Sequence, residues 1–192
     1  MGHPKRIRKK YDKPTHPWQK LRIEEERKLR KDYGLKSKRE IWKAETKLRN
    51  IRRQARLLLA RVDEQAKVES EQLINRIVRF GMSGAGIHLE DVLSLSLRDI
   101  LKRRLQTLVT TKGFANTPDQ ARQFITHGHI WLNNRKVTIP SYLVPIEEED
   151  QISFNQYSAI ADESHPARIQ PEKEEISEEI TEEVQEENGG KE

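Results

Sequence analysis

Opposite charges gather at the two ends of this 192-residue chain. Residues 1–61 hold 22 Lys and Arg against 7 Asp and Glu, a net charge of +15, whereas residues 147–192 hold 3 against 16, a net charge of −13. Hydrophobic residues make up 34% of the chain and charged residues 35%, so a single large apolar core is not expected. The basic block predicts a polyanionic partner, of which nucleic acid is the commonest.

Composition also excludes several kinds of chemistry. The chain has no cysteine, which removes disulfides, thiolate catalysis and cysteine-based zinc sites together. Its apolar runs are only a few residues long, so neither a membrane span nor a secretory signal is expected. We therefore predict a soluble cytoplasmic protein that needs no cofactor, metal ion or membrane.

The N-terminal part of the chain is predicted to be a basic arm that leads into helices. Residues 1–17 contain three prolines and almost nothing apolar, which indicates an extended arm. Residues 18–96 are expected to form a helical lobe that begins with a helix over 18–33. Pro17 favours the start of that helix and Gly34 favours its end.

The clearest helical periodicity of the chain follows. Ser37 and Glu40 form a capping-box pattern, and apolar residues then recur in steps of three and four from Ile41 to Ala66. A solvated helix face normally mixes its signs, but the other faces here are almost purely cationic, which favours a partner rich in phosphates. The cations are Lys43, Lys47, Arg49, Arg52, Arg53 and Arg56.

A further helix is expected from a cap at Ser70 through Phe80, and the glycine-rich stretch 81–86 follows it. Small residues at such a position are compatible with a phosphate-binding loop. This stretch lacks the Gly-Lys-Ser/Thr ending, however, and no strand precedes it. We therefore interpret it as a turn that ends the helix.

The fold class is predicted to be α+β, because residues 97–160 combine two helices with short strands. A helix over 97–112 follows the Ser96 and Asp99 capping pair, and a second begins at Thr117-Pro118. A turn at Asn133-Asn134 divides the first two of four β-like runs. The runs are 129–132, 135–139, 142–144 and 151–154. Residues 161–192 have no aromatic side chain and are expected to be a disordered acidic tail.

The stretch from Arg104 to Phe154 resembles the S-four RNA-binding domain, a small helix-helix-sheet module. The matching positions are Arg104-Leu105, Gly113, Thr117, Ala121, Ile125, Gly128-His129-Ile130, Asn133 or Asn134, Val137, Pro140-Ser141, Asp150 and Ile152. Where that family usually has Ser-Arg at the start of its second helix, this chain has Thr117-Pro118. One cation that faces phosphate is thereby lost, and we expect Arg122, one helical turn later, to compensate.

The flanking segments narrow the resemblance. Residues 11–18, the Tyr33-Gly34-Leu35 turn and residues 99–108 are similar to the archaeal and eukaryotic form of the S-four family of small-subunit ribosomal proteins. The resemblance covers residues 1–160. It implies a structural constituent of the small ribosomal subunit, without enzymatic activity or small-molecule substrate.

The same resemblance implies a particular place in the ribosome. Members of the family bind ribosomal RNA directly, hold a multi-helix junction, nucleate assembly and support translational accuracy. The implied partners are small-subunit ribosomal RNA and neighbouring small-subunit proteins, number five among them, and the implied location is the cytoplasmic ribosome.

Candidate RNA-binding residues lie in the arm and on the module as well as on the long helix. Phosphate and 2′-hydroxyl recognition needs Arg and Lys on helix faces and on flexible segments, and residues 99–146 carry 7 cations against 2 carboxylates, a net charge of +5. In the arm the candidates are Lys5, Arg6, Arg8, Lys9, Lys10 and Lys13. On the module they are Lys102, Arg103, Arg104, Lys112, Arg122, His127, His129 and Arg135.

Other features are interpreted without catalysis. His127 and His129 have no further ligand near them in sequence, so no metal site is expected. Residues 147–150 are four consecutive carboxylates, which favours a solvated loop over an acid/base pair. The tryptophans are candidates for base stacking, but Trp18 and Trp42 lie on helix stripes, which favours the core; Trp131 keeps the stacking alternative.

Three alternatives stay open at this point. The module also occurs in non-ribosomal RNA-binding factors and in RNA-modifying enzymes, of which this chain would be a fragment. The remaining residues are basic helices without a nucleophile, a base and an oxyanion site, which disfavours an enzyme. A DNA-binding regulator is disfavoured because no dimerising element is evident.

Overall fold

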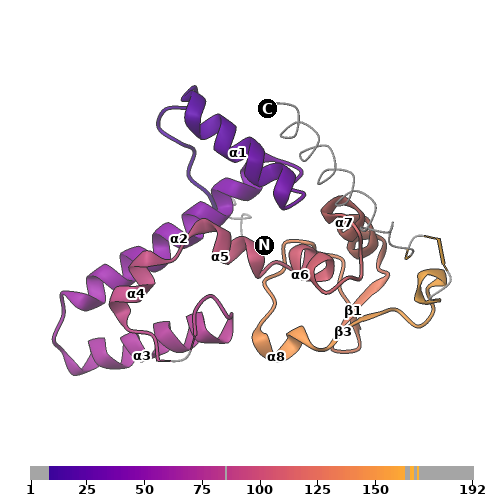
Figure 1. The fold of residues 1–192 in the computed structure, drawn as a ribbon. Coiled ribbons are helices and arrows are strands. Elements are labelled where there is room, and N and C mark those ends of the chain that lie inside the picture. The colour runs from indigo at the N-terminus through magenta and orange to yellow at the C-terminus, as the bar shows by residue number, and fades with distance from the viewer. Residues whose placement is uncertain (1–8, 85, 163–164, 167, 169–192) are drawn as a thin grey trace, which may run out of the picture.

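The computed structural model describes residues 9–84, 86–162, 165–166 and 168, and they form two lobes that lie side by side (Figure 1). The first lobe contains α1 (Lys20–Asp32), α2 (Lys38–Leu59), α3 (Glu64–Arg79), α4 (Leu89–Ser94) and α5 (Leu97–Lys102). The second contains α6 (Leu105–Thr111), α7 (Pro118–His127), β1 (Ile130–Leu132), β2 (Arg135–Lys136), α8 (Ile146–Glu149), β3 (Ile152–Phe154) and η1 (Ala159–Ala161). The predicted α+β class is confirmed.

Helix α2 is the axis of the first lobe. It buries one stripe that includes Ile41, Leu48 and Ala55, with α3, α4 and α5 packed against it. The predicted stripe holds as far as Leu58, but the helix ends at Leu59 and Val62 is 89% exposed.

A separate helix then begins earlier than the sequence predicted. Asp63 adopts an extended N-cap conformation, with φ −62° and ψ 151°, and α3 starts at Glu64. The chain turns back there, so that Leu73 and Ile77 reach the same core as α2. Ser70 is therefore an interior residue of α3, and its hydroxyl donates to the carbonyl of Lys67 at 2.7 Å.

The second lobe follows the predicted pattern most closely. The Thr117 hydroxyl accepts a hydrogen bond from the Gln120 backbone N–H at 3.2 Å, which starts α7 where expected. The sheet is antiparallel with the order β2-β1-β3, and Asn133-Asn134 makes the tight turn between β1 and β2. The run 142–144 is not a strand of this sheet.

The predicted single helix over 97–112 is wrong, because the chain is interrupted at Arg104. Its backbone is extended, with φ −74° and ψ 142°. The Leu105 N–H donates to the carbonyl of Tyr142 at 2.8 Å, and the Val144 N–H donates to the carbonyl of Arg103 at 3.0 Å. Pairing with this distant segment replaces the helical hydrogen bonds.

The interruption also divides the apolar core. One cluster of buried side chains ends at Leu101 and the other begins at Leu105. The expected boundary between residues 96 and 97 therefore falls inside the first lobe, because Ile100 and Leu101 pack there. The lobes meet at Arg103-Arg104.

Three local expectations also differ. Trp18 is 90% exposed, because α1 begins only at Lys20 and the indole precedes its packed face. Trp42 is half-buried and its Nε1 donates to Glu26 at 3.0 Å. Residues 146–149 form the short helix α8 rather than a loop. Among the helices that the structure describes, none combines the length and apolar character needed to cross a membrane.

Gly34 connects α1 to the other lobe, and its replacement tests that contact. Its φ is +57°, and a Cβ there would lie 2.6 Å from Gln106 Nε2 and 2.7 Å from the Pro118 Cβ. Gly34→Ala combines a left-handed backbone cost of about 1–2 kcal/mol with overpacking of about 1–3 kcal/mol. We expect urea denaturation to show a loss of stability of about 2–5 kcal/mol.

Gly86→Ala is the matched control. Gly86 also has a positive φ, +85°, but nothing lies within 4 Å of an added Cβ. Only the backbone cost of about 1–2 kcal/mol should appear. Equal losses in the two variants would mean that Gly34 does not hold the lobes closely together.

Candidate nucleic-acid interface

A groove runs along α2 where the two lobes meet. It consists of two adjoining hollows of about 440 and 270 Å³. Helix α2 lines it with Lys43, Lys47, Asn50 and Gln54, which share a face because they are three or four residues apart. The other walls come from α3, α5, α7 and the segment 140–143. We call this feature the inter-lobe groove.

Positive charge dominates the inter-lobe groove. Its lining contains one carboxylate, Glu40, and five cations. The cations are Lys43, Lys47, Arg76, Arg104 and Arg122. The lining thus has a net charge of +4, and its cations come from both lobes. A concave surface of this kind concentrates anions.

The Lys47 ammonium shows the effect of this crowding. Burial lowers its pKa, and the positive charges of Arg104, Lys43 and Lys10 lower it further. No carboxylate of the described residues lies within ion-pair distance of Lys43 or Lys47. A phosphate in the groove would therefore relieve repulsion among these cations, of which Lys43 and Lys47 have no carboxylate partner among the described residues.

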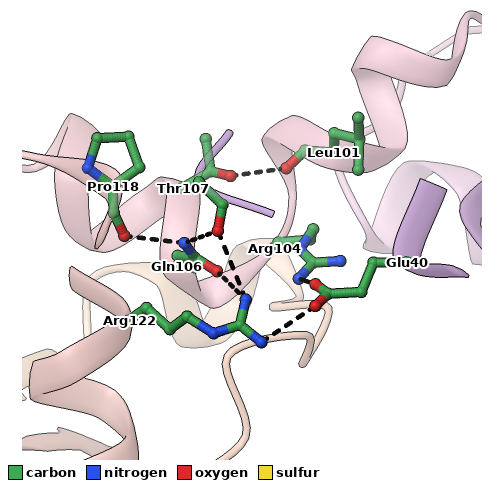
Figure 2. Close-up of polar contacts among 8 residues, drawn as sticks. Glu40, Leu101, Arg104, Gln106, Thr107, Pro118 and Arg122 are labelled. Atoms are coloured by element: carbon green, nitrogen blue, oxygen red, sulfur yellow. Dashed lines mark hydrogen bonds and ion pairs between the residues drawn. The ribbon is translucent and has the colours of Figure 1, made fainter. Parts of the chain in front are cut away.

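At the end of the groove, Glu40 joins the two lobes (Figure 2). Its Oε2 accepts from Arg104 Nη2 at 2.5 Å and its Oε1 accepts from Arg122 Nη2 at 3.0 Å. The side chains are 16%, 6% and 23% exposed, respectively. The sequence assigned Glu40 to a capping box, but the Ser37 side chain makes no capping bond. The carboxylate instead binds two guanidinium groups from the other lobe.

Gln106 extends this network into the interior. Its side chain is completely buried, and Nε2 donates to the carbonyls of Gly34 and Pro118, both at 2.8 Å. Its Oε1 accepts from Arg122 Nη1 at 3.4 Å (Figure 2). The amide thus connects the end of α1, the start of α7 and the Arg122 guanidinium. Sequence reasoning missed both Glu40 and Gln106 as site residues; a polar side chain among the leucines of α6 was the available signal.

The Glu40 carboxyl is held in its charged form. Burial raises its pKa, but the hydrogen bonds and charges of Arg122 and Arg104 outweigh burial and keep the pKa below its ordinary value of 4.5. The ion pairs therefore stabilise the folded state above that pH.

The described part of the N-terminal arm lies along α2. The Asp12 carboxylate accepts from Arg49 Nη1 at 3.1 Å, and the Asp12 N–H donates to Thr46 Oγ1 at 3.1 Å. The rings of Tyr11 and Trp42 are 6.1 Å apart. These contacts bring Lys10 close enough to Lys47 to lower its pKa, so the arm adds charge to the groove. Lys5, Arg6 and Arg8 lie outside the described residues.

Several predicted RNA-binding cations have partners inside the protein. Arg52 donates to the carbonyl of Leu95, Arg103 binds Glu149 at 2.7 Å, and Lys112 binds Asp150 at 2.9 Å. Arg104 and Arg122 bind Glu40 and also line the groove. Arg49 binds Asp12 and is exposed. The remaining described cations among the candidates are exposed: Lys9, Lys10, Lys13, Lys43, Lys47, Arg53, Arg56, Lys102 and Arg135. Their RNA contacts stay predictions.

The two candidate histidines lie together at the end of α7. Their rings are stacked, with centroids 6.3 Å apart, and His129 Nδ1 is 2.7 Å from the Ser158 hydroxyl. His127 is exposed and His129 is half-buried. Within the described residues, no three His, Asp or Glu side chains gather into a potential metal site.

Cationic walls from two lobes around one groove, beside a helix-helix-sheet module, are the features of an RNA-binding protein. Comparison with known families agrees. Residues 1–102 match the ribosomal protein S4/S9 N-terminal domain, and residues 103–152 match the S4 domain. The division between the two matches coincides with the junction at Arg103-Arg104.

Relatives of the whole chain extend the match. A protein of Methanococcus aeolicus is 53% identical over 175 residues, which cover 91% of this chain and 99% of the relative. Proteins of Methanothermobacter thermautotrophicus and Picrophilus torridus are 53% and 51% identical, over 80% and 88% of this chain and 90% and 94% of their own lengths. All three are described as small ribosomal subunit protein uS4. The chain belongs to the S4 family of ribosomal proteins.

Glu40→Gln tests whether the carboxylate holds the lobes together. Removing one partner of a buried ion pair leaves two guanidinium groups without compensation, so we expect a loss of about 3–5 kcal/mol at neutral pH. Because the folded-state pKa is below 4.5, the wild-type advantage should persist down to that pH and shrink as the pH falls through the folded-state value. Urea unfolding at a series of pH values measures both.

Glu45→Gln, also on α2, is the control, because the pKa of Glu45 is shifted in the opposite direction from that of Glu40. Burial raises the pKa of the Glu45 carboxyl, aided by the charge of Glu26 and opposed by that of Arg49. Its neutral replacement should therefore leave stability unchanged or increase it at neutral pH. A Glu40→Gln variant that behaved like this control would contradict the assignment of Glu40 to the junction.

Proposed function

We propose that this chain is a structural constituent of the small ribosomal subunit that binds ribosomal RNA through the inter-lobe groove. The observation that carries the proposal is the net charge of +4 in a groove whose cations come from both lobes. An RNA backbone that enters the groove contacts the helical lobe and the module together. Recognition of this kind rests on phosphates and shape, for which Lys and Arg suffice.

A structured RNA junction is the target that fits this geometry best. The groove is bounded by rigid elements held by the Glu40 network, and the basic arm and the exposed cations of α2 extend the charge beyond it. Helices that converge at a junction present several closely spaced backbones to such a surface. The proposed role is therefore to hold a multi-helix junction, and thereby to nucleate assembly and support translational accuracy, beside neighbouring proteins that include number five.

The alternatives are less well supported. An RNA-modifying enzyme would need a catalytic domain beside the module, but relatives described as uS4 align over 90–99% of their own length with this chain. A non-ribosomal binding factor is disfavoured by the match of residues 1–102 to a ribosomal protein domain. The proposed location is accordingly the cytoplasmic ribosome, without catalysis by this chain.

Replacing Lys43, Lys47 and Arg76 together by Gln tests the groove. Each cation that neutralises a phosphate releases counterion, at roughly 0.7–0.9 in the slope of log affinity against log salt. Loss of three contacts should weaken binding to a small-subunit ribosomal RNA junction transcript and make the slope shallower by about two. A salt titration of affinity measures this. Gln is a good helix former, so the helices should remain.

Lys20, Lys28 and Lys67 replaced together by Gln form the matched control. These cations are exposed on α1 and α3 and do not line the groove. The same loss of net charge should leave the slope nearly unchanged, because these side chains are not expected to contact phosphate. Similar slopes in both triple variants would show that the groove is merely a solvated surface.

A further inference from the structure

The outer face of the sheet carries an aromatic pair that the groove does not use. Trp131 lies between Ile130 and Leu132, which are both buried in the second core. Because side chains alternate along a strand, Trp131 points to the opposite face. Its cross-strand partners are Lys136 on β2 and Ser153 on β3. The outer face is therefore aromatic and polar, whereas the inner face is aliphatic.

Tyr157 completes the pair from the segment that follows β3. Its ring centroid is 6.3 Å from that of Trp131, and the two planes are inclined by 56°. Tyr157 is 87% exposed, so its ring gains little from burial within the protein. The Trp131 Nε1 is buried and has no hydrogen-bond partner among the described residues. The exposed Tyr157 ring thus has capacity for contact, whereas the indole N–H of Trp131 is covered by the protein. We call Trp131, Tyr157 and Lys136 the platform.

The cation of the platform lies over the end of α7. The Lys136 side chain crosses Gly128 so closely that a Cβ there would lie 1.9 Å from Cε. Burial lowers the pKa of His129, and the positive charges of His127, Lys136 and His165 lower it further. The Lys136 ammonium and the stacked imidazoles are therefore close together. Phosphate and flat rings are the two features that this combination recognises.

We propose that the platform binds unpaired nucleotides of a single-stranded RNA, with one base stacked on the exposed Tyr157 ring next to Trp131 and its phosphate beside Lys136. A protein partner is less favoured, because the neighbours of the two rings are Lys136 and Ser153 rather than an apolar surround. A duplex keeps its bases stacked inside and offers no free ring face. The site is separate from the inter-lobe groove and does not depend on it.

Tyr157 is the residue to replace, because a side chain that is 87% exposed contributes little to stability and its variant should stay folded. Binding of the full chain to a fluorescein-labelled oligouridylate of about ten nucleotides is measured by anisotropy. Tyr157→Ala should weaken binding by roughly 5- to 150-fold, the range for loss of one stacked base. Tyr157→Phe keeps the ring face and should bind like the wild type. Lys136→Gln should make the salt slope shallower by about 0.7.

A second measurement follows Trp131 directly. In the Trp18→Phe, Trp42→Phe background, where Trp131 is the one tryptophan left, the oligouridylate should quench tryptophan fluorescence, whereas a blunt RNA duplex of the same length should not. The proposal is overturned if Tyr157→Ala binds as tightly as Tyr157→Phe, or if duplex and single strand quench equally. The Lys43, Lys47 and Arg76 triple variant should retain the difference between Tyr157→Ala and Tyr157→Phe. Failure of the groove and failure of the platform are thus distinguishable.

The unpaired nucleotide has two possible sources, the RNA of the subunit itself or a strand that arrives from outside. An oligouridylate that carries 4-thiouridine should crosslink to the platform of the free chain. In purified small subunits, a crosslink between the oligouridylate and the platform supports a strand that arrives from outside. Loss of that crosslink, with a crosslink from Tyr157 to the RNA of the subunit in its place, supports a nucleotide of the subunit itself. A platform that crosslinks to no RNA in either preparation contradicts the proposal.

Discussion

The Glu40 carboxylate determines how the two lobes meet. It accepts hydrogen bonds from Arg104 and Arg122, which follow it by 64 and 82 residues. The buried apolar clusters of the two lobes are separate, although Leu143 of the second lobe packs on the first cluster, so directional polar contacts carry much of the junction. Burial makes those contacts strong and makes the loss of any partner costly. The shape of the inter-lobe groove, whose walls belong to both lobes, therefore depends on the Glu40 contacts together with the bond from Gln106 to Gly34.

Elements with local signals were the ones that sequence reasoning predicted well. Helix α7 has its cap, proline and terminal glycine within eleven residues of one another, and the β1–β2 turn is made by two adjacent asparagines. The break at Arg104 has no such signal, because the leucine stripe continues through it. Its cause is a pairing with Tyr142 and Val144, which no window of neighbouring residues contains. The end of α2 was missed similarly, since apolar spacing continued to Ala66.

The charged residues of the candidate site show the same limit of sequence-based prediction. A sequence reveals which residues are cations but not which of them are paired. Lys43 and Lys47 remain without a carboxylate partner in the described structure, whereas Arg103 and Lys112, equally basic in the sequence, bind Glu149 and Asp150. Gln106 is invisible to a charge count, although it is completely buried and connects three segments. Whether a cation is free to bind a ligand therefore depends on partners that lie far from it in the sequence.

The polar junction between the two cores also affects how the protein is degraded in the cell. Segments with their own cores unfold locally as separate cooperative units, and the free energy of opening is lowest at the junction between them. A ligand that contacts both sides favours the closed form by mass action. Protein that is bound to RNA should therefore resist proteases, because its two lobes stay together. Protein that is not bound to RNA should open at Arg103-Arg104 and be degraded. The polar junction at Arg103-Arg104 would then couple the lifetime of the protein to the supply of its RNA.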